Sequence, residues 1–374
     1  MNTVSLTRTT SGIAAGLARA LESIGGIGSF ISRGDTVLIK PNLNGTEVCT
    51  NGAVVEALIP LVRDAGASNI LIGESTFGDA KTTDMLFRKT GYAELARKHG
   101  VRLVNMNESE AVETTVARPL AARTLKIARE AVEADAIINV PVMKVHYATG
   151  ITLCLKNMKG VLVGDEKRRF HEIGLDKAIV DLNNTIRPAL NIIDATTCME
   201  RMGPRGGDPV KMDLIIAGAS AAETDCIGAR IMGYEPSEIR HLRYFMEMNS
   251  IDSACIRVAG ENIESCVRPF RRVSMENIVP SCFTVRNLDA CSSCMNAFLL
   301  SCGSLDQAER IPLEVFMGSA VPPSSSAPAA GSLRIAFGNC AGSMPCSFDA
   351  GIRGCPPYPF ALKEWLARKS PGSP

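Results

Sequence analysis

The sequence predicts an α/β protein with two parts: a domain built on a parallel-rich sheet with helices on both faces, then a smaller α/β, cysteine-rich metal domain. Two observations lead to this prediction. Short β-branched runs alternate with segments of helical apolar spacing, and cysteines gather in the last quarter of the chain. Because 374 residues exceed what one core usually holds, we place the domains at residues 1–270 and 271–370.

The first domain begins with a strand and an amphipathic helix, and strands and helices then alternate. The expected strands are residues 36–40, 69–73, 101–105, 136–140, 190–194 and 213–218, and the expected helices are residues 52–66, 82–99, 175–187 and 221–232. Strands that are apolar on both faces and separated by helices are typical of a mostly parallel sheet.

The second domain repeats this alternation on a smaller scale. We expect helices at residues 291–301 and 357–368, and strands at 313–318 and 333–338. Between the two strands, the Pro/Ser-rich segment at 321–332 has no apolar periodicity. It is therefore predicted to be a disordered loop.

Composition excludes several classes of protein. A formal net charge of +1, one Trp and five Tyr argue against nucleic-acid binding. No run of about 18 apolar residues predicts a membrane span. The first residues lack the apolar core of a signal peptide, so we expect a cytoplasmic protein. In that reducing compartment, clustered cysteines indicate a metal rather than disulfides.

Four cysteines form the sharpest chemical pattern. Cys291 and Cys294 make a CxxC pair, Cys340 follows a predicted strand, and Cys355 precedes two prolines. Loops that follow parallel strands converge at one sheet edge, and a proline after a cysteine is typical of ferredoxin ligands. We predict that these four bind one [4Fe–4S] cluster. Structural zinc, redox-active thiols and simple packing of buried thiols are the alternatives.

A second set of polar residues follows the strands of the first domain. Lysines within apolar strands need an anionic partner or perform chemistry, so a small anionic ligand is expected. Solvated loop residues are the alternative, and no dinucleotide or P-loop glycine motif is present. The predicted ligand-binding residues are Lys40, Asn42, Glu74, Lys144 and Asn157, and the candidate catalytic residues are His146, Lys156 and His171.

Several segments resemble one prokaryotic family. VLIKPNLNG, INVPVMKVHYATGITLCLKNMKG and IIDATTCMERMGP are similar to the family known as domain of unknown function 362, over roughly residues 35–250. The resemblance implies an iron–sulfur module, which members often carry. The chain departs from the commonest version, because it has no compact ferredoxin run. Its CxxC…GNC…GCPP arrangement looks like the cluster loops of hydrogenase small subunits.

A weaker similarity concerns three residues. His146, Lys156 and His171 have almost the spacing of a His–Lys–His set in nickel-pincer lactate racemases. This similarity implies Lys156 as the tether of a cofactor, His171 as a metal ligand and His146 as an acid or base. The alternative is that they bind an anion or stabilise loops.

The sequence thus favours an iron–sulfur redox protein, acting in electron transfer or reductase-type chemistry on an anionic small molecule bound in a basic cleft. A redox partner protein is a further candidate, and an oxidoreductase is the enzyme class to test. One alternative is a non-redox, racemase-like isomerase with a structural cluster. Another is a binding module with structural zinc.

Overall fold

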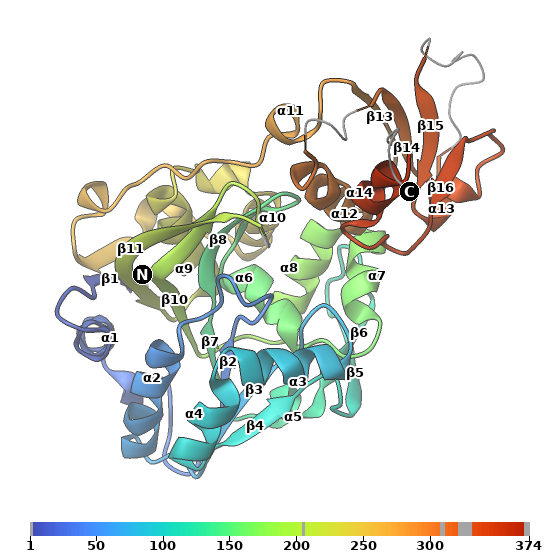
Figure 1. Cartoon of the computed structure of the whole chain (residues 1–374). Helices are drawn as coiled ribbons and strands as arrows, with labels where there is room; N and C mark the ends of the chain where they lie inside the picture. Colours follow the sequence, from blue (N-terminus) through green and yellow to red (C-terminus); the bar gives the residue numbers. More distant parts are fainter. Residues whose placement is uncertain (1–2, 204–205, 307–310, 321–330, 370–374) are drawn as a thin grey trace. The chain divides into compact units, whose positions relative to one another are not determined.

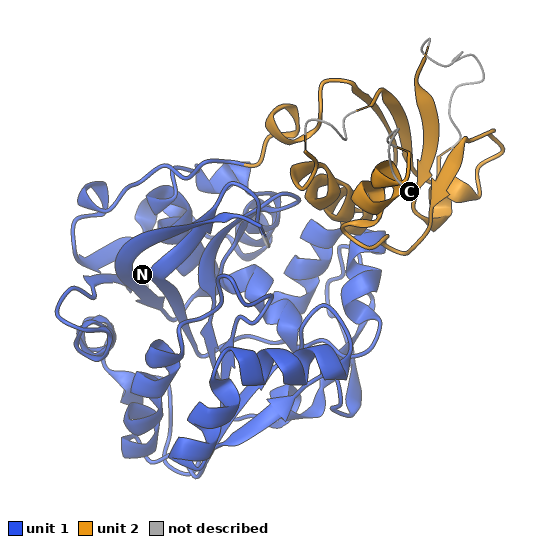
Figure 2. Ribbon diagram, viewed as in Figure 1, with its two compact units in different colours: residues 1–272 blue, residues 273–374 orange. Residues whose placement is uncertain are grey.

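The computed structural model describes residues 3–203, 206–306, 311–320 and 331–369. The chain divides into two compact parts, residues 1–272 and residues 273–374, here called unit 1 and unit 2 (Figure 2). Residues 321–330, most of the segment predicted as a disordered loop, lie outside the described residues.

Unit 1 is built on a ten-stranded sheet (Figure 1). Eight strands follow one another across it in the order β12 (Arg257–Gly260), β1 (Thr3–Arg8), β11 (Asp208–Gly218), β10 (Leu190–Glu200), β7 (Ala136–Val140), β2 (Thr36–Pro41), β3 (Asn69–Glu74) and β4 (Arg102–Asn105). From β10 to β4 all neighbours are parallel. The predicted parallel-rich α/β fold is therefore confirmed.

The antiparallel strands lie around β10 and β11. Strand β11 runs antiparallel to both β1 and β10, and β8 (Val142–His146) pairs with β10 and with the short β9 (Gly150–Thr152). Both β10 and β11 extend well beyond the predicted runs, because their polar ends pair with each other from Thr197 to Glu200. The extensions lack a strict polar/apolar alternation, with two adjacent threonines at 196 and 197 and a proline at 209, so they carry little strand signal.

Helices cover both faces of the sheet. Helices α1, α2 and α4 pack against side chains such as Val37 and Ile39, whereas α6, α8 and α9 lie on the other face. The helices of unit 1 are α1 (Ile13–Glu22), α2 (Gly52–Asp64), α3 (Ala80–Lys89), α4 (Tyr92–His99), α5 (Arg129–Glu133), α6 (Cys154–Asn157), α7 (Glu166–Ile173), α8 (Leu175–Thr185), α9 (Ala221–Ile231) and α10 (Arg240–Asn249). Short helical turns are η1 (Ile27–Ser29), η2 (Met158–Val161), η3 (Pro236–Glu238), η4 (Ser253–Cys255) and η5 (Ile263–Ser265).

One predicted helix was wrong in length. Residues 82–99 form two helices, α3 and α4, separated at Gly91, whose φ of 81° lies in the left-handed region that glycine tolerates. Sequence periodicity also gave no sign of the antiparallel pair β5 (Ala111–Thr115) and β6 (Thr124–Ala128).

Unit 2 contains a four-stranded parallel sheet in the order β13 (Phe283–Leu288), β14 (Leu313–Gly318), β15 (Leu333–Phe337) and β16 (Ala350–Ile352). Its helices are α11 (Met275–Ile278), α12 (Ser292–Gly303), α13 (Asn339–Gly342) and α14 (Ala361–Ala367). The apolar core places Phe298 of α12 edge-on to Phe337 of β15, with ring centroids 5.6 Å apart.

The predicted strand at 313–318 is confirmed, but the helix predicted from residue 357 begins only at Ala361. Three prolines precede it, at 356, 357 and 359, and they disfavour helical backbone in the residues before them, which shortens the helix at its amino end. Within the described residues, no helix has the length and apolarity needed to cross a membrane.

Candidate functional site

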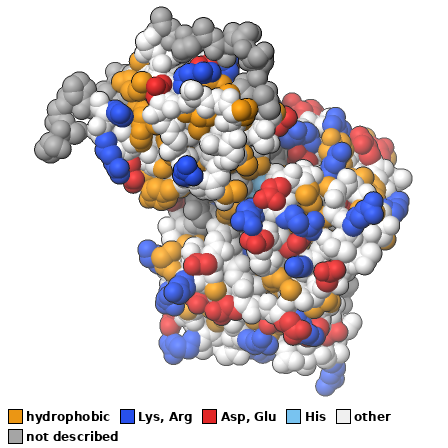
Figure 3. Space-filling model, turned by 90° about the vertical axis from the view of Figure 1, so that its right-hand side faces the viewer, with side chains coloured by type: hydrophobic (Ala, Val, Ile, Leu, Met, Phe, Trp, Pro, Cys, Tyr) orange, Lys and Arg blue, Asp and Glu red, His pale blue; other side chains and the backbone are white. Residues whose placement is uncertain are grey.

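The polar side chains of unit 1 that sequence patterns singled out lie at the carboxyl edge of its parallel strands. Lys40 and Glu74 end β2 and β3, and Lys144 and His146 lie on β8. All four are almost completely buried. On the exterior, by contrast, basic and acidic side chains are interspersed over the face of unit 1 visible in the lower part of Figure 3.

Lys40 and Glu74 neutralise each other. The Nζ atom of Lys40 lies 2.7 Å from Oε2 of Glu74 and also donates to the carbonyl of Pro41. Gly160 of η2 packs directly against the pair, because a Cβ atom there would lie 1.8 Å from Oε1 of Glu74 and 2.5 Å from Nζ of Lys40. The ion pair thus serves as a buried support for η2, and the ligand-binding role of both residues stays a prediction.

The amides of Asn42 and Asn157 belong to a buried chain of asparagines. Nδ2 of Asn42 donates to Oδ1 of Asn157 at 2.9 Å, and Nδ2 of Asn157 donates to Oδ1 of Asn139 at 2.8 Å. Asn139 in turn donates to Asn191 at 2.9 Å. This chain ties the loop after β2 to α6, β7 and β10. It fixes the backbone from which the neighbouring Lys156 projects.

A group of four basic side chains, here called the His–Lys group, gathers beside this scaffold: His146, Lys156, Lys159 and His171. Nζ of Lys159 lies 3.1 Å from Nε2 of His171. Burial, and then the charges of Lys159 and Lys156, lower the pKa of His171 to about 2. Burial, and then Lys156, His171 and Lys159, lower the pKa of His146 well below its usual value. These mutual effects show that the three predicted catalytic residues come together.

Lys159 was not among the predicted site residues. It lies three positions after Lys156, so that both lysines come from the continuous α6–η2 segment. Burial and the charge of Lys156 lower the pKa of Lys159. The i, i+3 spacing of two lysines in an otherwise apolar segment is the signal that could have found it.

The side chain of Lys144 is held by the backbone, and its charge acts on both Lys156 and Asp194. Its Nζ donates to the carbonyl of Val48, in the loop after β2. Its charge opposes the burial effect that raises the pKa of Asp194. A pocket of about 260 Å³ lies beside this loop, lined by Asn44 to Val48, by residues of α3 and by Met199.

His146 has a defined tautomer. Its Nδ1 atom accepts hydrogen bonds from the backbone N–H groups of Ala148 at 3.1 Å and Thr149 at 3.4 Å. Because the low pKa keeps the ring neutral, its single proton is on Nε2. His146 therefore offers a hydrogen-bond donor, and a proton-accepting role at neutral pH is disfavoured.

Asp225 of α9 positions the short helix α6. Its buried carboxylate accepts hydrogen bonds from the backbone N–H groups of Cys154 at 2.6 Å and Leu155 at 3.0 Å. Those are the first two residues of α6, where backbone donors have no partner within the helix. Asp225 thereby sets the direction in which Lys156 projects.

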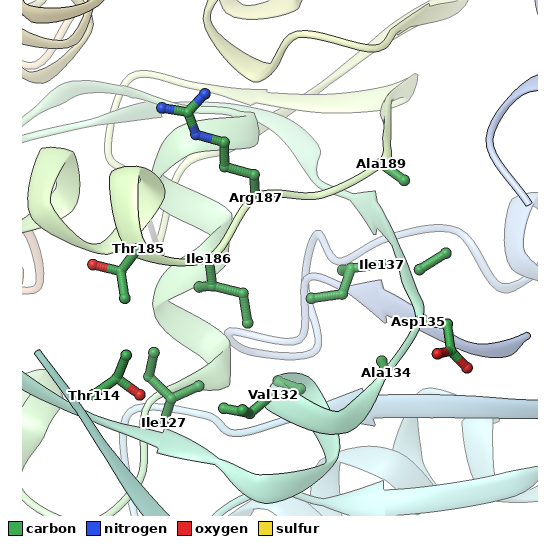
Figure 4. Close-up of a pocket in the computed structure, with 12 residues that line it drawn as sticks. Thr114, Ile127, Val132, Ala134, Asp135, Ile137, Thr185, Ile186, Arg187 and Ala189 are labelled. Atoms are coloured by element: carbon green, nitrogen blue, oxygen red, sulfur yellow. The ribbon is translucent and has the colours of Figure 1, made fainter. Parts of the chain in front are cut away.

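A pocket of about 230 Å³ lies at the opposite edge of the sheet, near the amino end of β7 (Figure 4). The side chains of Ile127, Val132, Ile137 and Ile186 surround its centre, and the guanidinium of Arg187 points away from them. No lysine or histidine lines it. Its lining is therefore unlike that of the carboxyl edge.

In unit 2 the four predicted cluster ligands follow three parallel strands. Cys291 follows β13 and caps α12, Cys340 lies in α13 directly after β15, and Cys355 follows β16. The loops after β15 and β16 are tied together, because the N–H of Asn339 donates to the carbonyl of Gly354 at 3.0 Å and Oδ1 of Asn339 accepts from the N–H of Gly354 at 2.9 Å.

Cys294 reaches this edge from the first turn of α12. Its thiol is hydrogen-bonded to that of Cys291, which together with burial and the thiols of Cys355 and Cys340 raises its pKa. A Cβ atom at Gly338 would lie 3.1 Å from its sulfur. Cys302 is packed in the apolar core of unit 2.

These contacts gather the four cysteines at one sheet edge. Cys355 lies six residues before α14, so no helix begins at this cysteine. Across the described ranges, no three or more His, Cys, Asp or Glu side chains are placed to hold a metal ion. Cluster binding stays a prediction.

Comparison with known proteins identifies the family. Residues 37–230, more than half of the chain, match the family described as Domain of unknown function (DUF362). A thylakoid-associated protein from Synechocystis sp. is 30% identical over 254 residues, which cover 64% of this chain and 77% of that protein. The chain belongs to the DUF362 family, as its motifs led us to expect.

Two solved structures show a weak overall similarity to this chain. A lactate racemase apoprotein from Thermoanaerobacterium thermosaccharolyticum has a TM-score of 0.44 at 13% identity, covering 84% of this chain and 69% of that one. A protein from Thermotoga maritima has a TM-score of 0.40 at 14% identity, covering 82% of this chain and 70% of that one. The similarity to lactate racemases is thus found, but at this depth it says nothing about activity.

Proposed function

We propose that this protein is an iron–sulfur protein that binds a small anionic molecule in unit 1 and carries out electron-transfer or reductase-type chemistry. The single observation that carries the proposal is the gathering of Cys291, Cys294, Cys340 and Cys355 from three loops at one sheet edge. Four Cys thiolates are the usual ligands of a [4Fe–4S] cluster. Such a cluster would accept and release one electron at a time.

The chemistry of the four donors suits this group, since a [4Fe–4S] cluster takes four thiolates. Cys340 and Cys355 are exposed and Cys291 is half-buried, so a cluster could be inserted from solvent. Only Cys294 is buried, and Gly338 leaves room beside its sulfur that any larger residue would fill. The CxxC pair, at the start of α12, brings two sulfurs to one turn.

The ligand of unit 1 is inferred from charge. Lys156 and Lys159 are half-buried beside two histidines, and burial, followed by the charge of Lys156, lowers the pKa of Lys159. Among the residues that the structure describes, no carboxylate lies within 4 Å of Nζ of either lysine. A carboxylate or phosphate group of a ligand would relieve this repulsion.

The cluster is tested first by composition. Protein purified without oxygen should contain about four iron and four sulfide per chain, and should show a reversible one-electron signal on reduction. Zinc without visible absorbance would overturn the iron–sulfur assignment. A cluster that cannot be reduced would overturn the redox assignment alone.

Variants then test the ligands. Serine at any of the four positions should lower the iron content. Cys255→Ser is the matched control, because Cys255 is exposed in unit 1. Equal iron in Cys340→Ser and Cys255→Ser would remove Cys340 from the set.

Anion binding needs its own measurement. Calorimetric titration with small carboxylates and inorganic phosphate should show binding that Lys156→Ala weakens about tenfold or more, as expected for the loss of one desolvated charge contact. Lys98→Ala is the control, because Lys98 pairs with Glu56 on an exposed helix. Equal weakening by the two variants would contradict the site.

A further inference from the structure

Two lysines at the same sheet edge have opposite surroundings. Lys40 is fully buried and lies 2.7 Å from the carboxylate of Glu74. The contact recorded for Nζ of Lys156 is with Oγ1 of Thr152 at 3.0 Å, one turn earlier in the chain. A hydroxyl can donate to a neutral amine as well as accept from an ammonium group. Lys156 is therefore oriented without being locked in its charged form.

The charges around Lys156 come from several elements. Lys144 on β8 and the other members of the His–Lys group are basic. The acid that acts on it is Asp176 of α8, which is already bound by Arg240 at 2.9 Å and lies 3.4 Å from Nδ1 of His241. Asp176 thus offsets only part of the repulsion. Burial, and then Lys144, lower the pKa of Lys156 to about 7.

We propose that Lys156 is a nucleophilic amine that forms an imine with the carbonyl carbon of a small anionic carbonyl compound of the 2-oxo acid class. The proposal rests on the anion site of the proposed function and names its substrate class. The charge of the nearby Lys144 attracts the carboxylate, and a bound anion would favour the ammonium form of Lys159. The proton on Nε2 of His146 provides a hydrogen-bond donor in the same group.

The reaction balances without any further reagent. The lone pair of the neutral Nζ attacks the carbonyl carbon, and the carbonyl π electrons move to oxygen, which takes one proton from the attacking nitrogen. The resulting carbinolamine forms the C=N bond as its hydroxyl leaves with a proton as water. Nothing is oxidised or reduced, and addition of water restores the amine.

Lys156 differs from ordinary lysines in the fraction of its amine that is neutral near pH 7. With a pKa of about 7, half of its population is neutral at pH 7. An exposed lysine with a pKa of about 10.4 is neutral in roughly one molecule in two thousand at that pH. Lysines desolvated next to other cations are the type that enzymes use for imine formation.

The experiment is reductive trapping on the full chain. Pyruvate and cyanoborohydride are added near neutral pH, and modified lysines are mapped by peptide mass spectrometry. We expect modification of Lys156 to exceed that of the exposed Lys98 at least tenfold. Excess propionate, which has the carboxylate but no ketone, should suppress it. Modification spread evenly over the lysines, or centred on Lys159, would overturn the proposal.

A second measurement separates this inference from the proposed function. Binding of propionate is followed by calorimetry without reductant. If propionate binds and Lys156 is not modified, the imine proposal fails while the anion site stands. If neither is seen, both fail. Lys156→Arg should keep propionate binding and lose the adduct, and an unchanged adduct yield in that variant would also overturn the proposal.

Discussion

Nζ of Lys159 lies 3.1 Å from Nε2 of His171, so a basic side chain and an imidazole share one hydrogen bond in a partly buried place. The contact requires a lone pair on one of the two nitrogens. His171 provides this lone pair, because its pKa of about 2 keeps the ring neutral at every physiological pH.

This contact predicts how stability depends on pH. Above a pH of about 6.5 the ring of His171 is neutral in both the folded and the unfolded chain. Below about pH 6.5, His171 binds a proton in the unfolded chain but not in the folded chain, so the free energy of unfolding falls. Between about pH 8 and about pH 5 the natural protein should lose stability, and His171→Gln should lose less of it. The difference between the two proteins should be at most about 1.4 kcal/mol per pH unit below the pKa of the unfolded histidine. Urea unfolding at both pH values measures this, and parallel curves would contradict it.

The Lys40–Glu74 pair predicts a strong coupling. Removing one member of a buried ion pair leaves an isolated charge, so Lys40→Met or Glu74→Gln should each cost about 3–5 kcal/mol of stability. The double variant should cost less than the sum. Lys98→Met breaks the exposed pair with Glu56 and should cost less than about 1 kcal/mol. Additive losses in chemical unfolding would show that the two side chains do not depend on each other.

The sequence predicted that Lys40 and Glu74 lie at the same sheet edge, but not that they pair with each other. Strand periodicity located β2 and β3, and the rule that strand ends meet at one edge put Lys40 near Glu74. It could not tell that the two neutralise each other, because that depends on side-chain directions set by Gly160. In unit 2 the three residues of β16 are too few to show periodicity, so the strand that places Cys355 was missed.

The surroundings of Lys156 predict an unusual titration. Competitive labelling with a trace amine reagent should show half-maximal reactivity of Lys156 near pH 7, because its ammonium form is disfavoured by burial and by Lys144. Lys144→Met should move this midpoint upward, since one repelling charge is removed. A midpoint near that of ordinary lysines, about pH 10, would contradict the described environment.

Asp225 is predicted to act on Lys156 through the backbone. In Asp225→Asn the side-chain amide can accept only one of the two hydrogen bonds from Cys154 and Leu155, so one buried N–H loses its partner. We expect a stability loss of about 1–3 kcal/mol and a lower yield of the Lys156 adduct in the folded protein. Asp181→Asn is a matched control, because that buried carboxylate accepts three N–H groups from residues 120–122 instead. Equal effects of both variants on the adduct would remove the positioning role.

Gly338 is predicted to decide whether the cysteine loops can take up iron. Its φ of 100° lies in a region that other residues rarely adopt, and a Cβ atom would lie 3.1 Å from the sulfur of Cys294. Gly338→Ala should therefore push the loop after β15 away from α12 and lower the iron bound per chain severalfold. Gly342→Ala lies in the same short helix, where a Cβ atom meets nothing within 4 Å, and should bind iron like the natural protein. Iron and sulfide analysis, with circular dichroism to confirm folding, measures both. A folded Gly338→Ala protein with full iron content would show that Cys294 and the loop need no such close approach.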